Sequence, residues 1–187
     1  MKKLTFLLIA SFLVVAVSCD KQMDTTSQSA SSLKSLQTEP EMKSAQIPQN
    51  FRAHLAGSNE VPANPSKATG EAIFQLSKDG LSLSYKLIVA NLENVKMSHI
   101  HLGQEGFTGG IVTWLYPAVP PLLLIPGTSN GILAEGVITS ANLTGGMTGK
   151  TILDLVDHFK AGNAYVNVHT SQYGPGEIRG QIMGNVK

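Results

Sequence analysis

Apolar and polar residues alternate over short runs of this chain, and turn-forming residues separate the runs. The clearest case is EAIFQLSKDGLSLSYKLIV, residues 71–89, in which an Asp-Gly pair at 79–80 joins two alternating runs. Successive side chains of a strand point to opposite faces, so such alternation predicts strands with one buried face. Asp-Gly between two of these runs predicts a hairpin. The pattern therefore favours an antiparallel, all-β domain.

Similar runs recur from residue 51 onward. We expect strands over 51–57, 71–77, 81–89, 96–102, 111–116, 132–139, 164–170 and 177–183. About eight strands with short connections predict an antiparallel β-sandwich or barrel. The 18 glycines, the 9 prolines and a charged fraction of only 14% agree with a compact, turn-rich domain.

One segment has the period of a helix instead. In TILDLVDHFKAG, residues 151–162, apolar side chains recur three, four and seven positions apart, at Ile152, Leu155, Val156 and Phe159. Thr151 and Asp154 resemble a capping box, and Gly162 is a plausible C-terminal cap. We predict one short helix over about 151–161, packed on the barrel.

A proline-rich segment, YPAVPPLLLIPGTSNG at 116–131, interrupts the strand pattern. Its four prolines remove hydrogen-bond donors, which argues against a central strand. We expect a long loop here. Residues 122–125 are then either covered or presented as an apolar patch that serves an adhesive or partner-binding role.

The N-terminus has the pattern of an export signal. Lys2 and Lys3 precede an apolar run over 4–17, which is too short for a transmembrane helix. Cys19 is the only cysteine of the sequence and follows this run directly, as in a bacterial lipoprotein signal. We predict a lipoprotein signal peptide over 1–18 and lipidation of Cys19. An ordinary secretory signal with an incidental cysteine is the alternative.

The segment between the signal and the domain differs from both in composition. The segment after the signal is rich in Ser, Thr, Gln and Lys and lacks aromatic residues, so it cannot bury enough apolar surface to fold. We predict a flexible tether over 19–48, starting at the lipidated cysteine, and one domain over 49–187. The protein would then be exported and held on the membrane of a bacterial cell envelope, on its periplasmic or surface side. A formal net charge of +1 gives no reason to expect a nucleic-acid partner.

Three histidines define the candidate site. In MSHIHLG, residues 97–103, His99 and His101 share one face of a strand, and AYVNVHT at 164–170 places His169 and Asn167 together. We expect all these side chains on the outward face of the barrel. The turn SQYGPG at 171–176 predicts a hairpin with the last strand. That hairpin would bring Glu177 and Arg179 near His169.

Two interpretations of this cluster stay open. His-x-His on a strand, joined by a third histidine, can hold a zinc or copper ion, with Glu177 as a further ligand or a support. Alternatively, the histidines, Asn167, Glu177 and Arg179 form a hydrogen-bonded network that holds the glycine-rich loop after His101 to the terminal hairpin and binds no metal. Arg179 favours this version because a guanidinium next to a cation is unfavourable. His54 and His158 are expected to be solvated. No residue stands in the sequence context of a catalytic nucleophile, so we favour a non-enzymatic binding module with an envelope protein or a small ligand as partner.

Four segments together resemble the CHRD domain, which is named for chordin and is also found in exported bacterial proteins. They are FRAHLAGSNEVPANP, GEAIFQLSKDGLSLSYKLIV, SHIHLGQEGFTGGIVTWL and GNAYVNVHTSQYGPGEIRGQI, which lie in order within about residues 50–184. The resemblance implies an immunoglobulin-like barrel that is distantly similar to copper/zinc superoxide dismutases. The residues of this chain that match the family's motifs are Glu60, His99, His101, His169, Glu177 and Arg179.

The similarity to superoxide dismutases also implies an alternative function. The domain would then be a copper-dependent redox enzyme or a copper carrier. Five histidines are too few for the dinuclear site of those enzymes, so one copper ion is the most that the resemblance implies here.

Overall fold

The computed structural model describes residues 50–184 of the chain. The predicted signal peptide over 1–18, the lipidation site at Cys19 and the tether over 19–48 lie outside the described residues. Among residues 50–184, no helix is both long enough and apolar enough to cross a membrane.

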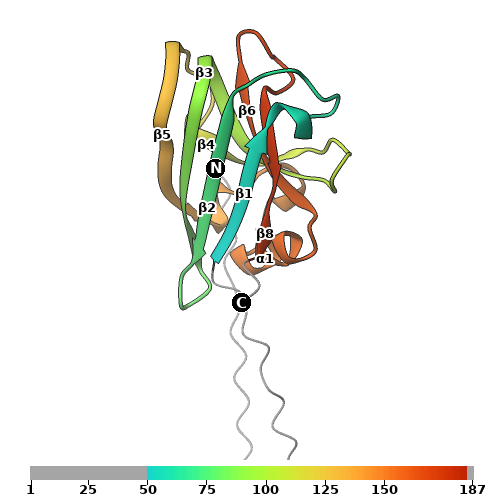
Figure 1. The fold of residues 1–187 in the computed structure, drawn as a ribbon. Helices are drawn as coiled ribbons and strands as arrows, with labels where there is room; N and C mark the ends of the chain where they lie inside the picture. The colour runs from blue at the N-terminus through green and yellow to red at the C-terminus, as the bar shows by residue number, and fades with distance from the viewer. Residues whose placement is uncertain (1–49, 185–187) are drawn as a thin grey trace, which may run out of the picture. The chain divides into compact units, whose positions relative to one another are not determined.

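Eight strands form one antiparallel sheet that curls into a barrel (Figure 1). They are β1 Asn50–Ala56, β2 Thr69–Leu76, β3 Ser82–Leu102, β4 Ile111–Tyr116, β5 Ile125–Thr139, β6 Ala164–Thr170, β7 Ile178–Gln181 and β8 Met183–Gly184. The order is β2-β1-β7-β6-β3-β4, and a further pairing of β2 with β3 closes a barrel of five strands. β5 extends the sheet beside β3, and β8 pairs with β1. The predicted all-β fold is confirmed.

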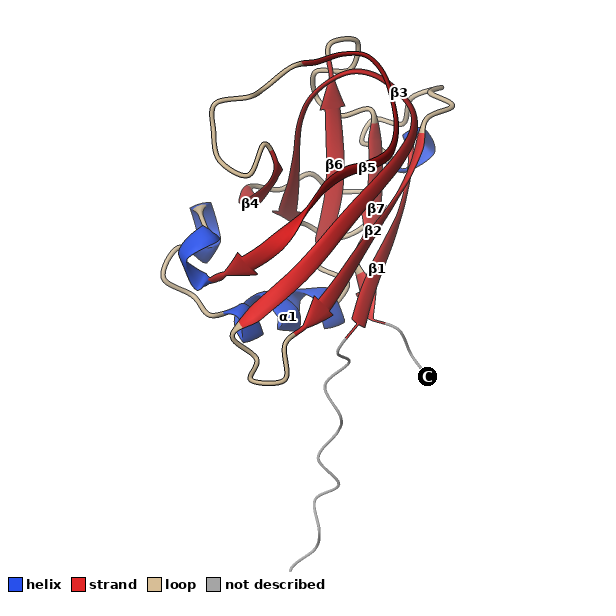
Figure 2. Cartoon of the chain, turned by 90° about the vertical axis from the view of Figure 1, so that its left-hand side faces the viewer, coloured by secondary structure: helices blue, strands red, loops and turns tan. Residues whose placement is uncertain are grey.

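β3 is the strand that joins the two halves of the barrel. The sequence pattern predicts separate strands over 81–89 and 96–102, but both belong to one strand of 21 residues. Asn91 and Asn94 between them have positive φ angles, which asparagine tolerates better than most residues, and the pairing with β5 shifts register at this point. Figure 2 shows β3 bending over the top of the barrel here. The first half of β3 therefore pairs with β2 and β5, and the second half pairs with β4 and β6.

The predicted helix is α1, Ile152–Lys160, which covers one end of the barrel (Figure 2). The capping box is present: the Thr151 hydroxyl accepts from the Asp154 amide, and the Asp154 carboxylate accepts from the Thr151 amide at 2.8 Å. All four predicted apolar positions of the helix are buried. Phe159 packs against Phe51 and Phe74, with ring centres 5.3 and 5.5 Å apart. Short 3-10 turns lie at Gly57–Asn59, Ser140–Asn142 and Gly145–Met147.

The proline-rich loop is shorter than the sequence pattern predicts. Residues 125–131 belong to β5 and pair with β3, from Val95 opposite Ile125 to Val89 opposite Gly131. Pro126 is tolerated there because β5 lies at an edge of the sheet. The remaining loop, 117–124, presents the side chains of Leu122, Leu123 and Leu124 to solvent, each about half exposed. Of the two alternatives for this segment, the exposed patch is the one observed for residues 122–124.

Candidate metal centre

The pairing of β3 with β6 brings the three histidines of the candidate site together. His99 lies opposite Asn167, and His169 lies opposite Met97, so His99 and His169 are diagonal neighbours on one face of the sheet. His101 follows two residues after His99 on the same face. One ring nitrogen from each of the three histidines lies within 4.8 Å of the other two.

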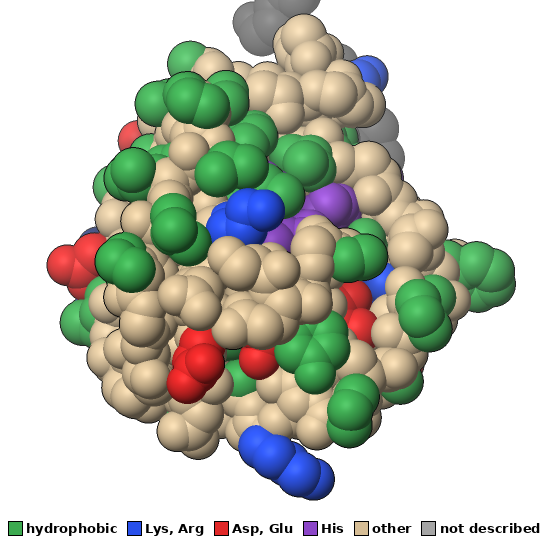
Figure 3. Space-filling view, turned by 90° about the horizontal axis from the view of Figure 1, so that it is seen from above, with side chains coloured by type: hydrophobic (Ala, Val, Ile, Leu, Met, Phe, Trp, Pro, Cys, Tyr) green, Lys and Arg blue, Asp and Glu red, His purple; other side chains and the backbone are tan. Residues whose placement is uncertain are grey.

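The outward face of these strands is covered rather than open to solvent. His99 is fully buried, and only 7% of His101 and 6% of His169 is exposed. The face does point out of the barrel, but the loops over 103–110 and 171–176 fold against it and contact the histidine rings. The Trp114 ring stands edge-to-face with His99 at 4.3 Å. His101 and His169 keep these small exposed fractions, so the cover is incomplete. Figure 3 shows histidine side chains at one surface of the molecule, between apolar side chains and next to a basic one.

Main-chain carbonyls determine which nitrogen carries the proton in two of the rings. Nδ1 of His101 lies 2.9 Å from the Gly109 carbonyl oxygen, and Nδ1 of His169 lies 2.8 Å from that of Gly174. Because a carbonyl oxygen only accepts hydrogen bonds, each Nδ1 must be the donor. In the neutral rings, Nε2 of His101 and His169 is therefore an unprotonated nitrogen that can bind a metal ion.

The His99 ring completes a set of three nitrogens. Its Nδ1 lies 3.3 Å from Nε2 of His169. In a tetrahedral zinc site with Zn–N distances of about 2.0–2.1 Å, two ligand nitrogens are about 3.3–3.4 Å apart. Within residues 50–184, the buried Nε2 atoms of His99 and His101 have no hydrogen-bond partner. We identify Nδ1 of His99 with Nε2 of His101 and His169 as the atoms that could hold a metal ion.

All three rings are held in the neutral state that metal binding requires. Burial is the main cause: together with the nearby His169 and His101 rings, it lowers the pKa of His99 to about 3. Burial also lowers the pKa of His101 and of His169. At neutral pH a metal ion would therefore meet neutral rings, and only the proton that Nδ1 of His99 shares with Nε2 of His169 would have to move to Nε2 of His99.

These lowered pKa values predict acid sensitivity of the metal-free protein. Histidines of the unfolded chain protonate near pH 6.5, whereas His99 in the folded chain protonates near pH 3. The unfolded state therefore binds more protons between these values. The contribution of the neutral rings to the free energy of unfolding should be complete above about pH 6.5. It should fall as the pH drops towards 3, by up to about 1.4 kcal/mol per pH unit for each additional proton that the unfolded state binds.

Urea unfolding in the presence of a chelator, repeated from pH 7 to pH 3.5, measures this effect. Carboxylates also titrate in this range, so the wild type is compared with His99→Gln, which removes one titrating ring. The variant should lose less stability per pH unit than the wild type. Equal losses in the two proteins would show that His99 is not held neutral.

Comparison with known families identifies the domain. The family model of the CHRD domain matches residues 51–182. The chain belongs to the CHRD domain family. No curated protein and no solved structure matches the chain.

In this CHRD domain, Glu177 has partners other than the histidines. The hydroxyl of Ser66 donates to Oε1 of Glu177 at 2.7 Å, and the hydroxyl of Thr170 donates to Oε2 at 2.6 Å. Glu177 therefore ties the connection between β1 and β2 to the end of β6. Its carboxylate is not part of the group of nitrogens around His99, although the sequence pattern suggested Glu177 as a ligand or a support.

Arg179 supports the site through an aromatic ring that the sequence analysis assigned no role. Its Nη2 donates to the carbonyls of Gln104 and Phe107 at 3.1 and 2.8 Å, which fixes the loop after β3. Its guanidinium carbon lies 3.4 Å from the centre of the Tyr165 ring, and Tyr165 stacks in parallel on His101 with 4.8 Å between ring centres. Tyr165, Asn167 and His169 occupy every second position of β6 and therefore share one face. This spacing is the sequence pattern from which a place for Tyr165 at the site could have been predicted.

Glu60 and Asn167 meet beneath the turn that leads into β7. Gly176 has a φ of +144°, and a side chain there would overlap Oε1 of Glu60 and Nδ2 of Asn167. Only glycine suits both the backbone and this close approach. Burial raises the pKa of the Glu60 carboxyl. Oε1 of Glu60 and Oδ1 of Asn167 are buried, and neither has a hydrogen-bond partner within the described residues.

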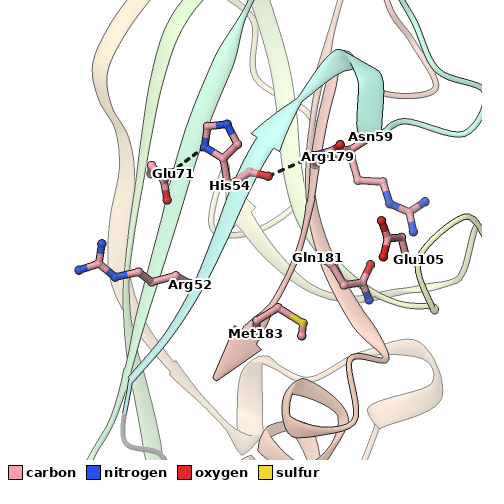
Figure 4. Close-up of a pocket in the computed structure, with 8 residues that line it drawn as sticks. All are labelled: Arg52, His54, Asn59, Glu71, Glu105, Arg179, Gln181 and Met183. Carbon is pink, nitrogen blue, oxygen red and sulfur yellow. Dashed lines mark hydrogen bonds and ion pairs between the residues drawn. The ribbon is translucent and has the colours of Figure 1, made fainter. Parts of the chain in front are cut away.

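The other two histidines lie apart from this group. His54 on β1 is paired with Glu71 at 2.7 Å and stays largely exposed, as predicted. It lines an open hollow of about 530 Å³ together with Arg52, Asn59, Glu71, Glu105, Arg179, Gln181 and Met183 (Figure 4). Nδ1 of His158 on α1 lies 3.1 Å from the side-chain nitrogen Nδ2 of Asn163.

Proposed function

We propose that this protein is a lipid-anchored protein of the bacterial cell envelope whose CHRD domain is a non-enzymatic binding module for one copper or zinc ion. His99, His101 and His169 are the proposed ligands. The observation that carries the proposal is the group of three ring nitrogens within 4.8 Å, in which main-chain carbonyls orient two of the rings. Three imidazoles suit both zinc and copper.

The unpartnered ring atoms support a metal site over a purely structural network. A network that serves only stability should satisfy its own buried polar atoms, because each unsatisfied one costs about 1–3 kcal/mol. Nε2 of His101 is instead buried without a partner in the described part of the chain. Arg179 does fix the loop after β3 through the carbonyls of Gln104 and Phe107, as the network interpretation expects, whereas Glu177 bonds to Ser66 and Thr170. Neither side chain satisfies the unpartnered ring nitrogen.

Metal titration of the full chain, purified in detergent and stripped with a chelator, tests the proposal. We expect one copper or zinc ion per chain, bound with a dissociation constant of about 1 μM or less. An excess of 100 times the dissociation constant should stabilise the folded state by about 2.7 kcal/mol. Binding no tighter than about 1 mM would contradict the proposal and leave the structural network as the function of the histidines.

The lipid anchor is proposed from the sequence around Cys19 and needs its own test. Cells that express the protein are fed a fatty acid with an alkyne tag, and the protein is then separated by membrane fractionation. We expect label on the wild type in the membrane fraction, and neither label nor membrane retention for Cys19→Ser. A labelled Cys19→Ser protein, or an unlabelled wild type, would contradict lipidation of Cys19.

A further inference from the structure

The open hollow of about 530 Å³ lies on the outer face of the barrel, where β1 runs between β2 and β7 (Figure 4). The three histidines of the proposed metal site do not line it. Two arginines and two glutamates do, so with His54 neutral the formal charges of its walls cancel: Arg52, Arg179, Glu71 and Glu105. These charges favour neither a simple cation nor a simple anion. A ligand that carries both charges can instead meet an opposite charge at each end.

Two of the four charges are available to such a ligand, and they lie on opposite sides of the hollow. Glu71 pairs with His54 at 2.7 Å, and the guanidinium of Arg179 is buried and held by main-chain carbonyls. Within residues 50–184, Arg52 and Glu105 belong to no ion pair. Figure 4 shows Arg52 on the β2 side of the hollow and Glu105 on the other side. A ligand that spans the hollow therefore meets a cation at one end and a carboxylate at the other.

Two amide side chains on the side of Glu105 present hydrogen-bond acceptors. Nδ2 of Asn59 donates to two main-chain carbonyls at 3.3 and 3.0 Å, and Nε2 of Gln181 donates to two others at 2.8 and 2.7 Å. Because a carbonyl oxygen only accepts hydrogen bonds, these contacts fix each amide and leave its oxygen as the remaining polar atom. Oε1 of Gln181 is buried without a partner in the described part of the chain. This side of the hollow therefore favours a ligand that brings N–H donors.

The size of the hollow favours a short peptide over a single amino acid. A compact hollow of 530 Å³ is about 10 Å across, and an extended chain advances about 3.3–3.6 Å per residue, so about three residues span it. The ammonium and the carboxylate of one α-amino acid are attached to the same carbon atom, so they cannot reach both sides. Met183, which is 56% exposed, adds an apolar contact for the middle of a longer ligand.

We propose that this hollow binds a short zwitterionic peptide of about three residues, with its carboxylate at Arg52 and its ammonium at Glu105. The amide oxygens of Asn59 and Gln181 accept hydrogen bonds from N–H groups of the peptide. The site does not include the three histidines and needs no metal ion. It is therefore a second binding activity of the domain, beyond the one proposed above.

The probe is trialanine, added to the full chain in detergent with a chelator present, and binding is measured by calorimetric titration. We expect a dissociation constant of about 100 μM or less. Trialanine amide lacks the carboxylate, and N-acetyl-trialanine lacks the ammonium. Each should bind about 3- to 10-fold more weakly, because each loses one partly solvated ion pair. Equal affinities of the three peptides, or no binding of trialanine at about 10 mM, would overturn the proposal.

Two variants test the assignment of the peptide ends. Arg52→Gln should weaken trialanine binding by about 3- to 10-fold but leave the binding of trialanine amide unchanged. Glu105→Gln should do the same for trialanine and leave N-acetyl-trialanine unchanged. Lys86→Gln and Glu135→Gln are the matched controls, because these two residues pair with each other at 3.3 Å outside the hollow, and neither change should alter any affinity. Equal losses for capped and uncapped peptides would overturn the assigned contacts at Arg52 and Glu105.

Discussion

Replacing His169 with alanine is expected to lower the affinity of the protein for copper or zinc on the order of 100-fold or more. Loss of a supporting hydrogen bond alone typically costs 10- to 100-fold in metal affinity, and this variant removes a ligand. His99 and His101 would remain, but both lie on β3, and two donors from one strand cannot enclose an ion. The affinity is measured by competition with a chelating dye.

Two histidines of the same chain serve as controls. His54→Ala and His158→Ala remove rings that pair with Glu71 and Asn163, outside the group of three nitrogens. Both variants should bind the metal as the wild type does. Circular dichroism shows whether His169→Ala keeps the β fold. A folded His169→Ala protein with unchanged affinity would rule out His169 as a ligand.

Replacing Phe159 with alanine is expected to destabilise the domain by about 3–5 kcal/mol. Phe159 is fully buried and packs against Phe51 of β1 and Phe74 of β2, so its removal leaves a cavity between α1 and the barrel. A loss of this size is a large part of the stability of a typical domain. Urea unfolding at pH 7 in the presence of a chelator measures the loss.

Leu153→Ala on the same helix is the matched control. Leu153 is 40% exposed, and its truncation should cost less than about 1 kcal/mol. Similar losses in the two variants would mean that the helix does not pack on the barrel through Phe159. A Phe159→Ala protein too unstable to purify would agree with the expected direction, and Phe159→Leu then supplies a smaller, measurable loss.

Local patterns were sufficient to predict most elements of this fold. The strands over 111–116 and 164–170 have the predicted bounds, because each is a run of strand-forming residues between turn residues. The capping box between Thr151 and Asp154 starts the helix where it was expected. The continuity of β3 was not predictable in this way. It depends on Asn91 and Asn94 adopting a backbone conformation that only the pairing with β5 reveals.

The candidate site, too, was predictable from local patterns only in part. Alternation alone places His99 and His101 on one face of a strand, and Asn167 and His169 on one face of another, because side-chain direction is a local property of a strand. That this face is covered was decided by the tertiary structure. The carbonyls of Gly109 and Gly174 that orient the rings come from loops, and the path of a loop depends on contacts distant in sequence. The sequence by itself therefore determined which histidines could meet, and only the packing of those loops decided that they meet as three buried, neutral rings.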